Sequence, residues 1–201
     1  MLFLKGVILV FLILATVSVA RADDDGSLFG IPMGTSLDEL DVAGRQKRSI
    51  YRLHRTPEFN LDFSHYMVRV HESTGVCLII AQTDLIITGP AGEELRQEFE
   101  RIMVPWSEKF GEPAIFDYIF RGSTALWAEL FMTKLRSNEA VLAAKWTYNH
   151  GNVMGEQVSE LLLIALPGTH GTASFVLQAR LNNYRDCMYA IRRDAERKAD
   201  G

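Results

Sequence analysis

Hydrophobic and polar residues recur along this chain with two periods, one typical of strands and one of helices. Strand patterns rich in β-branched and aromatic residues occur at 49–54, 66–71, 76–82, 115–120, 141–146, 159–166 and 173–181. Short turns at 72–75 and 167–171 each separate two of these segments. They therefore predict two β-hairpins.

The clearest helix is predicted over 93–110. Its apolar residues recur at helical spacing, and they are Leu95, Phe99, Ile102, Met103, Trp106 and Phe110. Pro105 predicts either a kink or a second short helix, because proline lacks the amide hydrogen that the preceding turn needs. Gly111 and Pro113 then end the segment.

Further helices are predicted near both ends of the folded region and in its middle. Thr35 or Ser36 can cap a short helix at 36–42, and 123–136 has a helical pattern. A C-terminal helix follows Asn182 and Asn183, with Cys187 in its apolar stripe, and its charged residues 192–201 are expected to fray. The polar, basic segment 44–48 is interpreted as a solvated turn.

The order of these elements indicates an α+β fold. We expect an antiparallel sheet built from two β-meanders, with helices packed on one face and a C-terminal helix. The 179 residues at positions 23–201 fit a single domain, and the 48% hydrophobic composition supplies a core.

The N-terminus has the pattern of a secretion signal. Lys5 precedes the apolar run Gly6–Ala20, and small residues at Ala20 and Ala22 predict cleavage after Ala22. The alternative is a retained membrane anchor, for which the run is short against the roughly 20 residues of a spanning helix. We therefore expect a periplasmic or secreted protein, without a membrane span after cleavage.

Charge and cysteine content refine this picture. Of the chain's 21 basic residues, Lys5 and Arg21 leave with the signal, so 19 basic residues remain against 25 acidic ones. This balance argues against a nucleic-acid partner. Cys77 and Cys187 are the two cysteines, and an oxidising compartment predicts a disulfide between them. Two separate buried thiols are the alternative.

One local motif resembles a known group of proteins. The spacing Gly30-x-x-x-Gly34-Thr35-Ser36-x-x-Glu39-Leu40, placed before a meander, is similar to the start of repeats in β-lactamase-inhibitor-like and BamE-like periplasmic domains. The resemblance covers about a dozen residues, and the central proline-containing helix departs from the simple pattern of those families. It implies a protein-binding role and no active site.

Catalytic motifs that could be tested are absent from the sequence, including the Gly-x-Ser-x-Gly elbow and His-Glu-x-x-His. His54, His65 and His71 fall in the first strand region with Asp62 nearby, and imidazole with carboxylate is a possible zinc set. Surface positions are the alternative for these residues. We therefore expect no cofactor.

A partner surface is the remaining hypothesis. Its candidate residues carry aromatic rings or polar tips near element ends, and they are Phe116, Tyr118, Phe120, Tyr148 and His150. The favoured interpretation is a non-enzymatic protein that binds another envelope or extracellular protein. The alternatives are an exported hydrolase or metal-dependent enzyme that uses the His/Asp cluster, and an envelope structural or assembly factor.

Overall fold

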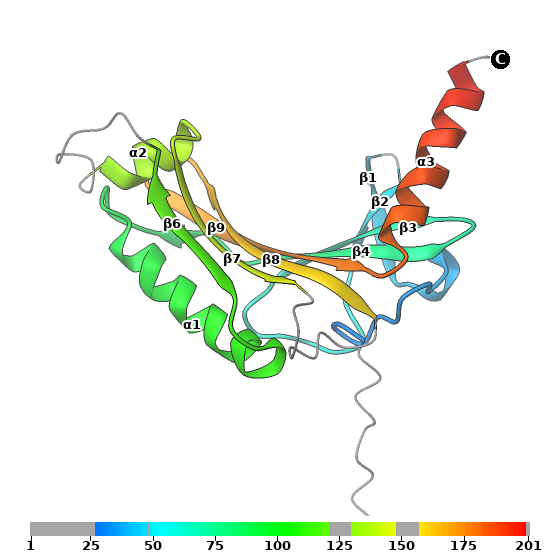
Figure 1. Cartoon of the computed structure of the whole chain (residues 1–201), viewed down its shortest axis with the longest axis horizontal. Coiled ribbons are helices and arrows are strands. Elements are labelled where there is room, and N and C mark those ends of the chain that lie inside the picture. Colours follow the sequence, from blue (N-terminus) through cyan, green and yellow to red (C-terminus); the bar gives the residue numbers. More distant parts are fainter. Residues whose placement is uncertain (1–26, 48, 121–129, 148–156, 200–201) are drawn as a thin grey trace, which may run out of the picture.

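The computed structural model describes residues 27–47, 49–120, 130–147 and 157–199, which form one antiparallel sheet with helices packed against it (Figure 1). The strands are β1 (Val42–Lys47), β2 (Ile50–Leu53), β3 (His65–His71), β4 (Gly75–Gln82), β5 (Ile86–Ile87), β6 (Ala114–Ile119), β7 (Ala140–Thr147), β8 (Val158–Pro167) and β9 (Thr172–Leu181). The helices are the 3-10 helix η1 (Leu37–Glu39), α1 (Glu93–Phe110), α2 (Phe131–Arg136) and α3 (Tyr184–Ala199). The expected α+β class is confirmed.

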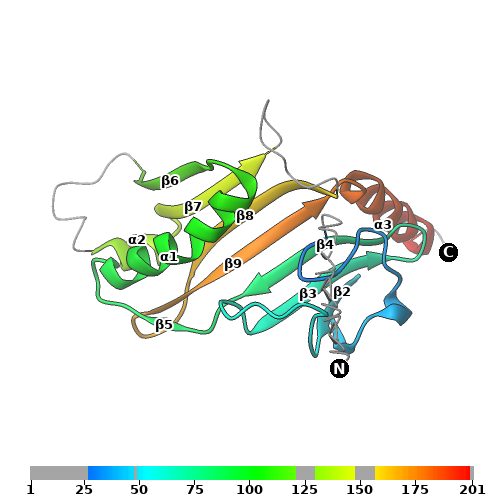
Figure 2. The same cartoon turned by 90° about the horizontal axis from the view of Figure 1, so that it is seen from below.

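The strands follow the order β1-β2-β3-β4-β9-β8-β7-β6, and β5 pairs with the first residues of β9 (Figure 2). Strands β1–β4 form one meander and β6–β9 form the other, so the two expected meanders are present. They join where β4 pairs with β9, with Ile80 opposite Gln178. Both predicted hairpins, β3–β4 and β8–β9, are present.

One face of the sheet, which we call the core face, is covered by α1. Alternate residues of the central strands, such as Ile79, Leu163 and Phe175, are fully buried there. The buried side of α1 supplies Leu95, Phe99, Ile102, Trp106 and Phe110. α2 packs against β7 and β8 beside the start of α1. This layer of helix on sheet contains most of the hydrophobic core.

The residues before β1 cover the core face over the first meander. The ring of Phe29 packs edge-on against Tyr66 of β3 and Trp106 of α1, with ring centroids 5.1 Å and 5.9 Å away. Leu28 and Ile31 are buried beside it. The N-terminal segment therefore joins the first meander to the helix of the second.

The C-terminal helix α3 lies on the opposite side of the sheet from α1 (Figure 1). Its link to the sheet is a disulfide between Cys77 and Cys187, whose Cα atoms are 6.3 Å apart. The predicted pairing is thus confirmed. A β-bulge makes it possible, because Val70 pairs with Val76 and Arg69 with Leu78, which leaves Cys77 as the extra residue.

The start of α3 is also held by polar contacts. The side-chain amide of Asn183 donates hydrogen bonds to the carbonyls of Thr74 and Val76 at 2.9 Å and 3.0 Å. The side chain of Asn183, directly before α3, therefore ties the helix to the β3–β4 turn. The disulfide and this contact fix the same end of α3.

Several local predictions were wrong. The segment Gly44–Lys47, expected to be a turn, belongs to the edge strand β1. The helix predicted at 36–42 is the single 3-10 turn η1, followed by strand. Of the two alternatives at Pro105, the second short helix is wrong, because α1 continues through that residue. α3 remains helical to Ala199 although its charged end was expected to fray. Strand β5 was not anticipated.

Candidate functional site

The four residues considered for a metal site lie apart. His65 and His71 occupy opposite ends of β3, roughly 20 Å apart at the usual strand rise. His54 follows β2 and is exposed, and Asp62 lies in the loop before β3. In the part of the chain that the structure describes, no three His, Cys, Asp or Glu side chains are grouped closely enough to hold a metal ion.

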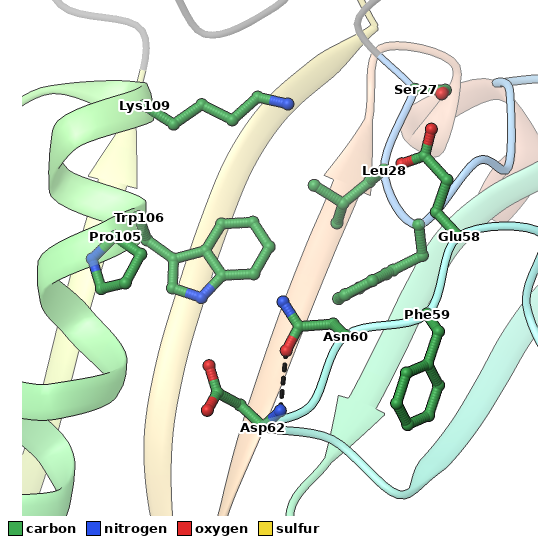
Figure 3. Close-up of a pocket in the computed structure, with 10 residues that line it drawn as sticks. Ser27, Leu28, Glu58, Phe59, Asn60, Asp62, Pro105, Trp106 and Lys109 are labelled. Atoms are coloured by element: carbon green, nitrogen blue, oxygen red, sulfur yellow. Dashed lines mark hydrogen bonds between the residues drawn. The ribbon is translucent and has the colours of Figure 1, made fainter.

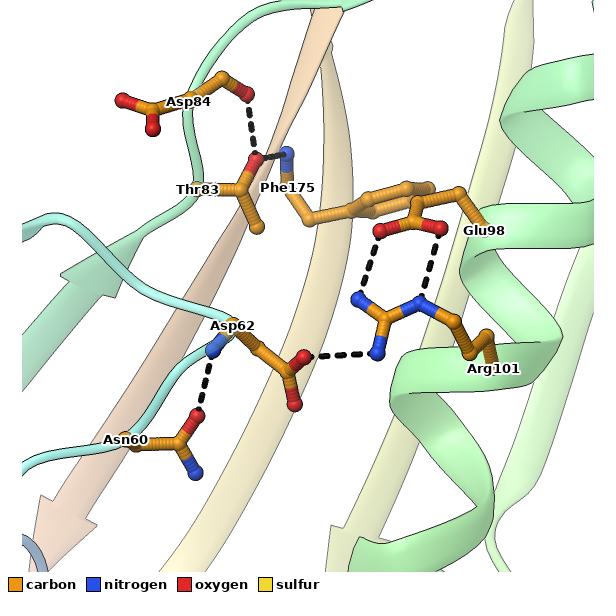
Figure 4. A network of polar contacts seen from close by, with 7 residues as sticks. All are labelled: Asn60, Asp62, Thr83, Asp84, Glu98, Arg101 and Phe175. Atoms are coloured by element: carbon orange, nitrogen blue, oxygen red, sulfur yellow. Dashed lines mark hydrogen bonds and ion pairs between the residues drawn. The ribbon is translucent and has the colours of Figure 1, made fainter.

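Asp62 is instead part of an ion network that joins its loop to α1 (Figure 4). Arg101 donates to Asp62 Oδ1 at 2.7 Å and to both carboxylate oxygens of Glu98 at 2.6 Å and 2.9 Å. These bonds raise the pKa of Arg101, and the bond from Arg101 lowers the pKa of Glu98. The arrangement favours the charged forms of Arg101 and Glu98 and fixes the loop against the helix.

His71 joins the β3–β4 turn to α3. Its Nε2 lies 3.2 Å from Asp194 Oδ2, and its Nδ1 lies 2.9 Å from Ser73 Oγ. The order Ser, His, Asp resembles a hydrolase triad, but the backbone N–H of Ser73 donates to the same Nδ1 at 3.2 Å. A contact between residues two apart is typical of a turn. The geometry therefore describes a link between the turn and the helix.

A small pocket opens between the N-terminal segment, the 58–62 loop and α1 (Figure 3). Its cavity volume is about 240 Å³, and Leu28, Trp106 and Lys109 contribute to its walls. The carboxylates of Glu58 and Asp62 also face it, and Asp62 is already bound to Arg101. This volume is below the range typical of small-molecule sites. The pocket offers no arrangement of acid, base and nucleophile.

A larger surface lies on the sheet face opposite α1, where no described helix covers β6, β7, β8 or β9 (Figure 1). We call it the open face. Strand pairing places these residues in register on it: Phe116, Tyr118, Ala143, Lys145, Glu160, Leu162, Ile164, Leu166, Ser174, Val176, Gln178, Arg180, Ile80, Gln82 and Met67. In its middle Leu162, Ile164 and Ile80 are partly buried, whereas Ala143, Ser174 and Val176 are buried, and α3 borders the face over β3 and β4.

Three of the predicted partner residues lie at the β6 margin of the open face. Tyr118 and Phe120 are 44% and 50% exposed, and their rings pack edge to face with centroids 5.2 Å apart. Phe116 is opposite Ala143 on the same face. Tyr148 and His150, the other two candidates, lie outside the described residues.

The charges on the open face are mostly basic. Glu160 forms ion pairs with Lys145 at 2.6 Å and with Arg180 at 2.7 Å. The carboxylate is 17% exposed, whereas the two basic side chains are 37% and 43% exposed. One carboxylate balances only one of the two cations. This part of the face therefore carries net positive charge in a chain whose total is −4.

The central residues of the open face were missed by sequence reasoning. Leu161, Leu162, Leu163 and Ile164 are all apolar, so the alternation that separates an inner from an outer face is lost. The continuous apolar run could have predicted that both faces of β8 carry apolar side chains. Leu161 and Leu163 lie on the core face, and Leu162 and Ile164 lie on the open face.

Fold and surface together define an α+β protein whose sheet is covered by α1 on one face and left open over four strands on the other, within the described residues. Comparison with protein-family models, curated proteins and solved structures finds no match. None of the helices described for this chain is both long and apolar enough to cross a membrane.

Proposed function

We propose that this chain is an exported, non-enzymatic binding protein whose open face takes up the surface of another envelope or extracellular protein. The Cys77–Cys187 disulfide supports export, because such bonds persist in oxidising compartments. The apolar N-terminal run with small residues before position 23 supports a cleaved signal. The resemblance of residues 30–40 to protein-binding periplasmic domains points in the same direction.

The open face carries this proposal. The side chains of Leu162 and Ile164 form a short apolar strip along β8, Ile80 of β4 lies beyond Gln178 of β9, and aromatic rings lie at the β6 margin. Apolar sheet surface bordered by polar side chains is typical of a protein-binding site. The absence of a grouped metal-ligand set among the described residues lends weight to binding over metal-dependent catalysis.

The chemistry of the face also specifies its partner. Lys145 and Arg180 share one carboxylate, so the partner should present acidic side chains beside apolar ones. A nucleic acid or an anionic lipid surface would meet the same cations, but the net charge of the whole chain, −4, opposes both. We therefore favour an acidic, apolar protein surface.

Site-specific photo-crosslinking in the exporting cell tests this proposal. A photoreactive residue at position 162 or 164 should give one discrete adduct with another exported protein. The matched control is position 104 on α1, where Val104 is 50% exposed on the other side of the sheet. Equal adducts from positions 164 and 104, or no adduct from the open face, would contradict the proposal.

Binding of the identified partner then supplies the quantitative test. Ile164→Glu should weaken binding by roughly tenfold or more, because it places a carboxylate on the apolar strip before an acidic partner. Val104→Glu should leave the affinity unchanged. Affinity should also fall as salt is added, since the basic side chains are exposed. Intact mass of the recovered protein, expected to begin at Asp23, checks export.

A further inference from the structure

The free edge of β6 is the second feature of the molecule that invites a partner. β6 stands at the end of the strand order, and among the described strands it pairs only with β7. The N–H of Phe120 donates to the carbonyl of Glu139, its direct opposite, at 2.8 Å. By the alternation of antiparallel ladders, Ile115, Asp117 and Ile119 then direct their backbone groups away from β7.

This edge lacks the usual protection against pairing. Natural edge strands carry lysine, proline or bulges that prevent association. Ala114–Ile119 contains none of these, and its pairing with β7 shows no register shift. Its one charged residue, Asp117, is bound by Arg96 through two bonds of 2.9 Å and 3.2 Å. The edge is therefore apolar, flat and nearly neutral.

The sequence of the edge is self-complementary. Residues 115–119 read Ile-Phe-Asp-Tyr-Ile, which has the same order of chemical types in both directions. Antiparallel pairing with a second copy about Asp117 places Ile115 opposite Ile119 and Phe116 opposite Tyr118. The outward backbone groups would form about six hydrogen bonds. Cross-strand aliphatic and aromatic pairs are the favourable ones in sheets.

We propose that two copies of this chain pair through β6, in antiparallel register centred on Asp117, to form a two-fold symmetric dimer with one continuous sheet. The two Asp117 side chains meet at the axis, where each is already neutralised by Arg96 of its own copy. The backbone of α1 lies closer to β7 than to β6, although its Arg96 side chain reaches Asp117, so helix axes over β7 would stand about three strand spacings apart in the dimer. That separation of about 14 Å exceeds the usual 8–10 Å helix packing distance.

The dimer explains the exposed aromatic margin of the open face. Phe116 and Tyr118 of each copy would pack on those of the other, and the open faces would join into one surface. The dimer is inferred from the backbone and sequence of β6, and it does not depend on the proposed binding of another protein by the open face. Ile115 lies on the core face of β6, so changing it leaves the open face intact.

Sedimentation over a concentration series tests the dimer. We expect a reversible dimer whose dissociation constant rises roughly tenfold or more in Ile115→Lys, since each dimer loses two aliphatic pairs and gains two edge charges. Ile115 is 55% exposed, and Val104, at 50%, provides the matched Val104→Lys control, which should dimerise like the original protein. Unchanged thermal unfolding would show that both variants remain folded.

Cysteine crosslinking tests the register. Asp117→Cys should give a disulfide-linked dimer on mild oxidation, because only residue 117 meets its own copy. Ile115→Cys and Val104→Cys should not. A monomer at every concentration, dimerisation unchanged by Ile115→Lys, open-ended oligomers, or crosslinking at 115 instead of 117 would each overturn the proposal. Partner binding by Ile115→Lys, measured separately, shows whether the open face acts without the dimer.

Discussion

The carboxylate of Asp62 and the guanidinium of Arg101 are 39 residues apart in the chain and are joined by a hydrogen bond of 2.7 Å. Asp62 lies in the loop before β3, and Arg101 lies on the helix that covers the second meander. The bond therefore links the two halves of the fold. Glu98, also on α1, accepts two hydrogen bonds from the same guanidinium and so orients Arg101 toward the loop.

Loss of this link should cost a measurable part of the stability. We expect Asp62→Asn to lower the free energy of unfolding by about 1 kcal/mol, because a partly exposed, hydrogen-bonded ion pair is worth about that much. Chemical denaturation gives the value, and Glu100→Gln, an exposed carboxylate on α1, is the control. A double-mutant cycle with Arg101→Met should show coupling of the two residues. Purely additive losses would disprove the link.

Stability should also depend on pH through Glu98. Its pKa is lowered from the ordinary 4.5, first by the bond from Arg101. A carboxyl whose pKa is lower in the folded state stabilises that state above its unfolded pKa, and this contribution is lost as the pH falls through the folded value. We therefore expect the free energy of unfolding to fall below about pH 4.5. Glu98→Gln should flatten that fall, whereas Glu100→Gln should leave its slope unchanged.

Most strands could be predicted from the sequence because their side chains are buried on at least one face. Strands β3, β4, β8 and β9 contain β-branched and apolar residues that only a sheet accommodates. β1 was missed because an edge strand needs one bonded neighbour and little burial, so Arg45, Gln46 and Lys47 are tolerated there. β5 is two residues long and too short for any periodicity.

The candidate site was predicted only in part. Phe116 and Tyr118 lie on the edge strand β6 and Phe120 directly follows it, and their aromatic rings were the signal in the sequence. The aliphatic residues of the open face could not be predicted. Leu162 and Leu163 are identical in type, and the sequence does not show which face of the sheet each side chain takes. Nor could spacing show that His65 and His71 lie at opposite ends of one strand without a correct strand boundary.

The disulfide should hold α3 to the sheet. Among the described strands and helices, α3 makes its main contacts with β3 and β4. Cys187 is the residue of α3 that is fully buried. We expect the double variant Cys77→Ala/Cys187→Ala to lose about 2–4 kcal/mol of stability. Hydrogen exchange should accelerate most in α3, while the amides of β8 and β9 keep their protection. A uniform loss across the sheet would show instead that the bond acts on the whole fold.

The two faces of β8 provide the sharpest test of the architecture, because neighbouring leucines should respond differently. Leu163 is fully buried in the hydrophobic core on the core face of β8, so Leu163→Ala should cost about 2–5 kcal/mol by leaving a cavity there. Leu162, its neighbour on the open face, is only partly buried. Leu162→Ala removes the same atoms from a site that solvent already reaches, and should cost less than about 1 kcal/mol. Chemical denaturation of both variants gives the comparison, and equal losses would mean that a further element of the chain covers the open face.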